Sequence, residues 1–257
     1  MSVFGDYSNY YDLLYKDKDY QGEVDYIYSL IEKHIDGKEA KVLELGCGTG
    51  KHALLLAEKG LNIHGVDMSA DMLDQAKLLI ADSPDENCGK VTLAQGDVRN
   101  YRTDQKFDVC ISLFHVMSYQ TKNADLQAAF KTAAEHLKPG AIFIFDYWYG
   151  PSVLTQKPEV RVKRLEDGQV AMVRIAEPVI YLNENRVQVN YSIGIENMRD
   201  GKVKKLRESH NMRYLFLPEI ELLAGSEFNV LEHYGWMKGA APTSDDWAGV
   251  SVLERKL

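Results

Sequence analysis

The sequence has few cysteines, a deficit of positive charge and no long hydrophobic run. Its three cysteines, Cys47, Cys88 and Cys110, are widely spaced, so they indicate neither a zinc site nor a disulfide framework. No stretch reaches the ~18 apolar residues of a membrane span, and the N-terminal stretch lacks the basic and apolar regions of a secretory signal. A protein with these features is expected in the reducing cytoplasm.

The charge balance argues against a nucleic-acid partner. Acidic residues outnumber basic ones by 38 to 30, which gives a net charge of -8. A protein that binds a phosphate backbone usually carries the opposite excess. A local basic patch remains at residues 202–207, although a solvated strand or turn explains it better. The 257 residues, 45% of them hydrophobic, suit a globular α/β domain with an insertion.

The most informative stretch is KVLELGCGTG at residues 41–50. Its apolar first half is typical of a buried parallel strand. Helical spacing follows over residues 51–59. Glycine suits the turn between them, because it accepts positive φ and lets a ligand approach the backbone. The turn is formed by Gly46, Cys47, Gly48 and Gly50, and we interpret its cysteine as a packing residue.

Asp67 follows the next predicted strand, residues 61–66. An acid about 20 positions after such a turn can accept hydrogen bonds from ribose hydroxyls. A dinucleotide fingerprint would place its third glycine one residue later, where Lys51 stands. Glu44, just before the turn, would repel a pyrophosphate but could hold a cationic head group. The pattern favours a ligand that has a ribose and an ammonium group and lacks phosphate.

ELGCGTG, VDMS and QGDV together resemble motifs I, II and III of the class I S-adenosylmethionine-dependent methyltransferases. This resemblance implies S-adenosylmethionine as the cofactor. In QGDV, Asp97 would accept the exocyclic amine of adenine and Val98 would pack on the ring; an ordinary turn aspartate is the alternative. The cofactor-binding residues expected in and beyond these motifs are Glu44, Gly46, Cys47, Gly48, Gly50, Asp67, Met68, Met72, Gly96, Asp97, Val98, Leu113 and Phe114.

The order of elements predicts an α/β fold with a Rossmann-like, seven-stranded, mostly parallel sheet and helices on both faces. Helices are expected at residues 23–34, 51–59, 70–81, 124–137 and 218–224. Core strands are expected at residues 41–45, 61–66, 91–95, 107–113, 141–145, 228–237 and 247–257. Ser69 is expected to cap the helix at 70–81. The expected divisions are an N-terminal lid and helix (1–40), a cofactor-binding core (41–150), an insertion (151–216) and a C-terminal completion of the core sheet (217–257).

The insertion shows a different texture from the core. Its predicted strands, separated by Asp167-Gly168, residues 183–185 and Asp200-Gly201, span residues 160–164, 169–175, 179–182, 186–196 and 203–214. Apolar residues alternate from Val187 to Ile195, as in an antiparallel sheet with one wet face. The sheet is either a structural flap, a substrate cover or the surface of a homodimer.

Tyrosines crowd the N-terminal stretch before the first helix. They bring apolar area and a hydroxyl together, and a sulfonium ligand gains from nearby π faces. In the family that the chain resembles, this segment closes over the cofactor as a lid. Tyr11, Tyr15 and Tyr20 are therefore expected at the cofactor, although a segment that pins its rings onto the core is the alternative.

Ligands of open parallel sheets bind beyond the carboxyl ends of the strands. The residues that follow the strands at 107–113 and 141–145 should therefore meet the acceptor. A lone histidine is often structural, but here His115 is a candidate for substrate handling. Tyr15, His115 and Tyr119 are the candidate catalytic residues; His115, Ser118, Tyr119, Tyr147, Trp148 and His210 are the candidate substrate contacts. No metal-ligand set is evident.

YDLLY, SYQTKNADL and FDYWYG, with the inserted sheet, resemble the small methyltransferases that dimethylate amino groups of nucleotide-linked sugars. Those enzymes carry two serines and a glycine in motif IV, where this chain has His115-Val116. The resemblance implies a small-molecule amine substrate, with a sugar hydroxyl, another small amine or a surface polysaccharide as alternatives. A dehydrogenase, an aminopropyltransferase and a non-catalytic cofactor-binding subunit are the other classes that the fold would permit.

Overall fold

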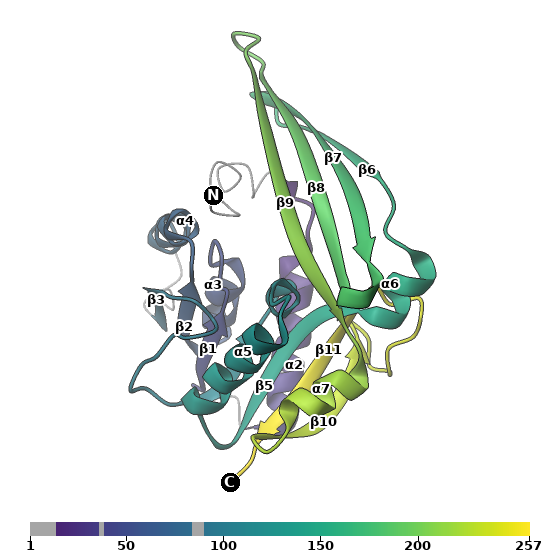
Figure 1. The fold of residues 1–257 in the computed structure, drawn as a ribbon. Helices are drawn as coiled ribbons and strands as arrows, with labels where there is room; N and C mark the ends of the chain where they lie inside the picture. The colour runs from purple at the N-terminus through teal and green to yellow at the C-terminus, as the bar shows by residue number, and fades with distance from the viewer. Residues whose placement is uncertain (1–13, 36–38, 84–89) are drawn as a thin grey trace.

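The computed structural model describes residues 14–35, 39–83 and 90–257. Its core is a seven-stranded sheet in the order β3-β2-β1-β4-β5-β11-β10 (Figure 1). The first five strands run parallel, and β11 and β10 are antiparallel additions. These strands are β1 (Lys41–Leu45), β2 (Asn62–Asp67), β3 (Val91–Gln95), β4 (Phe107–Ser112), β5 (Leu137–Tyr149), β10 (Phe228–Gly235) and β11 (Ala248–Arg255). The predicted Rossmann-like core is confirmed.

Helices cover both faces of the core sheet. On one face, α2 (Tyr20–His34) and α3 (Lys51–Glu58) bury their apolar sides. On the other face, α5 (Asn123–His136) and α7 (Leu217–Ala224) pack around a cluster of aromatic rings from β5. Helix α4 (Ala70–Ala81) contacts α3, β2 and β3, and Ser69 caps it by accepting a hydrogen bond from the backbone N–H of Met72 at 3.3 Å.

The insertion forms an antiparallel sheet, as predicted, but with four strands in place of the expected five. It consists of β6 (Arg161–Glu166), β7 (Val170–Tyr181), β8 (Arg186–Asn197) and β9 (Val203–Leu215). Helix α6 (Gly150–Gln156) leads into it, and a 3-10 turn η3 (Leu182–Glu184) joins β7 to β8. The last residues of β9 pair in parallel with the last residues of β5. The antiparallel sheet therefore rises from the end of β5 at which a parallel sheet binds ligands (Figure 1).

Several element boundaries differ from those predicted. The strands expected at residues 169–175 and 179–182 are one strand, β7, that runs through Pro178. Strand β6 pairs with β7 only as far as Ala176, so Pro178 has a neighbouring strand, β8, on one side only. Proline has no N–H to donate to a second neighbour, and such an edge position tolerates it. Strand β5 extends from Leu137 to Tyr149, well beyond residues 141–145. Helix α6 was not predicted; Pro151 lies in its first turn, where proline is well tolerated.

One face of the antiparallel sheet is apolar and turned inward. The alternating residues from Val187 to Ile195 are buried or half-buried, as their spacing predicted. Leu14 is fully buried against this face beside Met172 and Ile193. The residues from Leu14 to the start of α2 therefore cross from the antiparallel sheet to the core.

Candidate functional site

The glycine turn after β1 adopts the backbone that its sequence requires. Gly46, Gly48 and Gly50 all have positive φ, at 84°, 54° and 76°. The N–H of Gly46 donates to the carbonyl of Val66 at 2.7 Å, which ties the turn to β2. A β-carbon on Gly48 would meet no atom within 4 Å, so the backbone there is open to a ligand.

Asp67 lies opposite this turn at the end of β2. Its Oδ2 accepts a hydrogen bond from the N–H of Gly48 at 2.9 Å, and its Oδ1 accepts one from the N–H of Ser69 at 2.8 Å. Burial nevertheless raises the pKa of this carboxyl. The two backbone donors fix the carboxylate in place and leave it acceptor capacity for ligand hydroxyls.

Glu44 is buried below the turn, with 1% of its surface exposed. Its Oε2 has no hydrogen-bond partner among the described residues. Burial, and secondarily the nearby charge of Asp67, raises the pKa of Glu44 to about 8. A cationic ligand group would offset the cost of this burial by supplying the missing partner.

A cavity of about 480 Å³ opens between the glycine turn and the inner face of the antiparallel sheet. It therefore spans the cofactor and acceptor sides that the sequence predicted. The predicted residues that line it are Tyr15, Tyr20, Gly46, Cys47, Gly48, Asp67, Met68, Met72, Asp97, Val98, Leu113, Phe114, His115, Tyr119, Trp148 and His210. Candidates from the glycine turn, η2 (Val116–Tyr119), β5 and β9 thus share one space.

Other candidates are not among the lining residues or lie outside the described part of the chain. Glu44 lies beneath the cavity, and Tyr11 is outside the described residues. Gly50 precedes α3, where a β-carbon would lie 3.0 Å from Ala76 of α4. A β-carbon on Gly96 would lie 2.5 Å from the ring of Tyr101. Both glycines therefore permit close packing between elements.

The candidate substrate contacts Ser118 and Tyr147 require correction. Ser118 is fully buried, and its Oγ accepts a hydrogen bond from the N–H of Trp148 at 3.0 Å. Tyr147 is also fully buried and packs with Phe145 in the helix-covered core. Side chains alternate along β5, so Trp148 faces the cavity and Tyr147 faces away from it.

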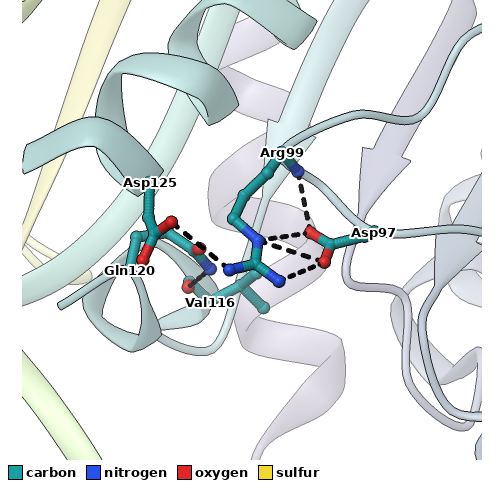
Figure 2. Close-up of polar contacts among 5 residues, drawn as sticks. All are labelled: Asp97, Arg99, Val116, Gln120 and Asp125. Carbon is teal, nitrogen blue, oxygen red and sulfur yellow. Dashed lines mark hydrogen bonds and ion pairs between the residues drawn. The ribbon is translucent and has the colours of Figure 1, made fainter. Parts of the chain in front are cut away.

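Asp97 is already engaged by a neighbouring cation (Figure 2). Its Oδ1 accepts hydrogen bonds from the backbone N–H and the Nε of Arg99, both at 2.9 Å. Arg99 also contacts Asp125 across the loop, at 3.3 Å. The guanidinium lowers the pKa of Asp97. Arg99 therefore fixes the carboxylate of Asp97 at the cavity wall. An adenine amine that bound this carboxylate would share it with Arg99.

His115 forms a pair with an acid that the sequence reasoning missed. Asp146 is a buried residue of β5, and it accepts a hydrogen bond from the backbone N–H of His115 at 2.9 Å. Its Oδ2 also lies 2.7 Å from the ring Nδ1 of His115, as an ion-pair contact rather than an aligned hydrogen bond. Phe114 and His115 both have positive φ, at 63° and 65°. The carboxylate thus holds a strained loop and its imidazole at the cavity.

A second histidine pair lies across the cavity. The hydroxyl of Tyr119 is 2.7 Å from Nδ1 of His210, and Nε2 of His210 is 3.1 Å from Oε2 of Glu208. Tyr191 of β8 packs edge-on against the His210 ring. The sheet that was expected to cover the site therefore supplies polar groups to it.

The N-terminal segment places aromatic rings and a cation at the cavity. Tyr15 packs edge-on against Phe114, with ring centroids 5.0 Å apart. The ammonium of Lys18 lies 4.2 Å from the ring centroid of Tyr20 and 4.5 Å from that of Phe114. Burial lowers the pKa of Lys18. These rings form a surface that accepts a cation at close range.

Sequence reasoning also missed other residues that line the cavity. They are Thr49, Lys51, His52, Arg99, Val116, Gln120, Tyr191, Met212 and Trp247. His52 is held by Glu23 through Nε2 at 2.8 Å. The sequence carried a usable signal for Tyr191, since the alternation of apolar residues placed it on the inner face of the sheet.

Among residues 14–35, 39–83 and 90–257, no group of His, Cys, Asp and Glu could hold a metal ion, and no helix is long and apolar enough to cross a membrane.

The glycine turn, the fixed carboxylate of Asp67 and the strand order together indicate the class of protein. Residues 42–140 match a family model described as a methyltransferase domain. Residues 42–140 therefore form a methyltransferase domain, as the motifs predicted, and the fold is that of the class I enzymes.

Within that family, the chain is similar to enzymes of sugar modification. It is 28% identical over 190 residues to dTDP-3-amino-3,4,6-trideoxy-alpha-D-glucopyranose N,N-dimethyltransferase of Streptomyces venezuelae. The aligned residues cover 73% of this chain and 76% of the relative. It is 28% identical over 191 residues to dTDP-3-amino-3,6-dideoxy-alpha-D-glucopyranose N,N-dimethyltransferase of Streptomyces fradiae, covering 74% and 71%. A sugar N-methyltransferase of Streptoalloteichus superposes with a TM-score of 0.80 at 19% identity, over 100% of this chain and 97% of that one, and supports the fold.

Proposed function

We propose that this protein transfers methyl groups from S-adenosylmethionine to the amino group of a sugar carried on a nucleotide. The observation that carries the proposal is the single cavity that joins the glycine turn to the antiparallel sheet. A methyl donor at the turn and an acceptor at the sheet would meet there. The printed activities of the two Streptomyces relatives favour a sugar amine as the acceptor.

The residues around the turn fit the methyl donor. The two oxygens of Asp67, fixed by backbone donors, suit the hydroxyls of a ribose. Glu44, buried without a partner for Oε2 among the described residues, suits the ammonium of the amino acid part. Asp97 and Val98 would hold the adenine. The rings of Tyr20 and Phe114 already hold a cation, Lys18, and suit the positively charged sulfonium.

The bound donor supplies a methyl group on a good, neutral leaving group. The protein therefore needs mainly to bring the acceptor nitrogen into line and to exclude water. His115, tied to Asp146 on the core side, and Tyr119, tied to His210 on the sheet side, are placed to hold the acceptor between them. Trp148 and Met212 add apolar surface to the same wall.

The test is methyl transfer by the purified protein from S-adenosylmethionine to dTDP-3-amino-3,6-dideoxyglucose. A hydroxyl substrate without an amino group, dTDP-glucose, separates amine from hydroxyl transfer. We expect one or two methyl groups on the amine by mass spectrometry and none on the hydroxyl sugar. Methyl transfer confined to dTDP-glucose would assign an O-methyltransferase. Binding of the cofactor product without transfer to either sugar would contradict the proposed acceptor.

A further inference from the structure

Three polar side chains form a line that leads away from the cavity. Tyr119, at the end of η2, lines the cavity, and its hydroxyl contacts Nδ1 of His210 at 2.7 Å. Nε2 of His210 contacts Oε2 of Glu208 at 3.1 Å. His210 and Glu208 are two residues apart on β9, so both lie on its inner face. His210 is 4% exposed, so the line is shielded from bulk water.

The chemistry of these groups fixes the direction of both hydrogen bonds. An ionised glutamate only accepts, so the imidazole proton of neutral His210 must be on Nε2. Nδ1 is then an acceptor, and the hydroxyl of Tyr119 must donate to it. Tyr119 lines the cavity, and a phenol oxygen that donates its proton to His210 can still accept from a ligand N–H.

The surroundings keep Tyr119 a neutral phenol. Its pKa is raised well above the usual value, first by burial and then by Tyr15, Tyr191 and Glu208. Two cations of the sheet lie near these groups: the guanidinium of Arg174 stacks over the ring of Tyr191 at 5.1 Å, and Arg213 donates to the carbonyl of Thr121 at 3.2 Å. Tyr119 therefore accepts a proton only if it passes its own proton on at the same time.

We propose that Tyr119, His210 and Glu208 form a proton relay that removes a proton from the acceptor's ammonium group before the methyl group is transferred. This inference rests on the proposed function. The ammonium gives one proton to the oxygen of Tyr119 while the hydroxyl proton of Tyr119 moves to Nδ1 of His210. The imidazolium so formed is stabilised by the carboxylate of Glu208, a positioning residue.

The steps balance for each methyl group. The deprotonated nitrogen uses its lone pair to form the N–C bond, and the S–C bond breaks with its electron pair retained by the sulfur. Between turnovers the proton on His210 leaves by way of Glu208, whose side chain is 13% exposed to solvent. A monomethylated product still carries an ammonium proton, so the same relay serves a second transfer.

The relay predicts the protonation state of His210 in the free protein. We would label histidine with ¹⁵N and assign the His210 signals by their loss in His210→Gln. The Nε2–H tautomer at neutral pH, with Nδ1 shifted by a hydrogen bond that disappears in Tyr119→Phe, is the expected result. An Nδ1–H tautomer would overturn the relay, and this readout needs neither cofactor nor substrate.

The kinetic test uses dTDP-3-amino-3,6-dideoxyglucose as the acceptor. Tyr119→Phe should lower kcat by roughly 100-fold or more near neutral pH, with little change in affinity for S-adenosylhomocysteine. The loss should shrink as pH rises and the free amine becomes abundant. Glu208→Gln can still accept from Nε2–H, so it should keep the tautomer but lower kcat. A full kcat in Tyr119→Phe, or a loss of equal size at every pH, would contradict the relay.

The structure offers a matched control. Tyr101 contacts Nε2 of His64 through its hydroxyl at 2.6 Å, and neither residue lines the cavity. Tyr101→Phe removes an equivalent tyrosine–histidine bond and should leave kcat within about twofold of the wild type. Because groups in one network are coupled, the losses in Tyr119→Phe and His210→Gln should be non-additive. If the wild type transfers no methyl group, the proposed function fails, while the histidine spectra still decide the relay geometry.

Discussion

Replacement of Glu44 by glutamine should make the protein more stable and its cofactor site weaker. Glu44 is buried with an unpartnered Oε2 among the described residues, and its pKa is raised to about 8 from the ordinary value of 4.5. The folded protein therefore holds this proton up to about pH 8, whereas the unfolded chain loses it near pH 4.5. Stability falls as the pH rises through that window.

The size of the effect follows from this linkage. At pH 7 the unfolded chain gains about 3 kcal/mol from ionising Glu44, and at pH 5 it gains only about 1 kcal/mol. Glutamine has nearly the shape of the protonated carboxyl and cannot ionise. Glu44→Gln should therefore raise the free energy of unfolding by up to about 3 kcal/mol at pH 7, with a much smaller gain at pH 5.

Urea denaturation at pH 5 and pH 7 measures the gain, with Glu58→Gln at the exposed end of α3 as the control. Calorimetry with S-adenosylhomocysteine measures the accompanying loss. Glutamine cannot ionise to pair with the ligand ammonium, as Glu44 would on binding, so Glu44→Gln should weaken binding by roughly 10- to 150-fold. A stability change independent of pH, or destabilisation at pH 7, would refute the reasoning on burial. Unchanged affinity would remove Glu44 from the cofactor site.

Three further substitutions test other parts of the site. Asp67→Ala should weaken S-adenosylhomocysteine binding by about 1–3 kcal/mol in calorimetry, through loss of charge-assisted hydrogen bonds; unchanged affinity would exclude the ribose assignment. His115→Ala should lower kcat far more than cofactor affinity in steady-state assays, and no effect on either would make His115 structural. Gly46→Ala should destabilise the fold by about 1–3 kcal/mol in urea, because its β-carbon would lie 2.5 Å from Val116 at a φ of 84°. Gly48→Ala is the control, since its β-carbon would meet open space; an equal loss in both would contradict the packing argument.

The core fold was predictable because its signals are local. The apolar run before the glycine turn, the capped helix at Ala70–Ala81 and the strand at Val91–Gln95 need only their own neighbours to be recognised. The limits of β5 and β7 are different. Their extra residues are strands only because β11, β9 and β8 supply partners from distant parts of the chain.

The candidate site divides in the same way. Its cofactor half follows one turn and the two strand ends beside it, so sequence spacing located most of it. Its acceptor half depends on which face of a strand each side chain points to, and on contacts between elements that are far apart in the sequence. Parity along β5 turns Trp148 to the cavity and Tyr147 to the core. Glu208 and His210 are near neighbours on β9, but His210 meets Tyr119 only because β9 packs against η2.

The central claim is that the glycine turn and Asp67 bind the methyl donor rather than a dinucleotide. The most direct measurement is calorimetric titration of the purified protein with S-adenosylhomocysteine and, in parallel, with NAD. We expect micromolar binding of S-adenosylhomocysteine and no binding of NAD. Binding of NAD alone, or of neither ligand, would contradict the assignment of the turn and of the carboxylates beside it.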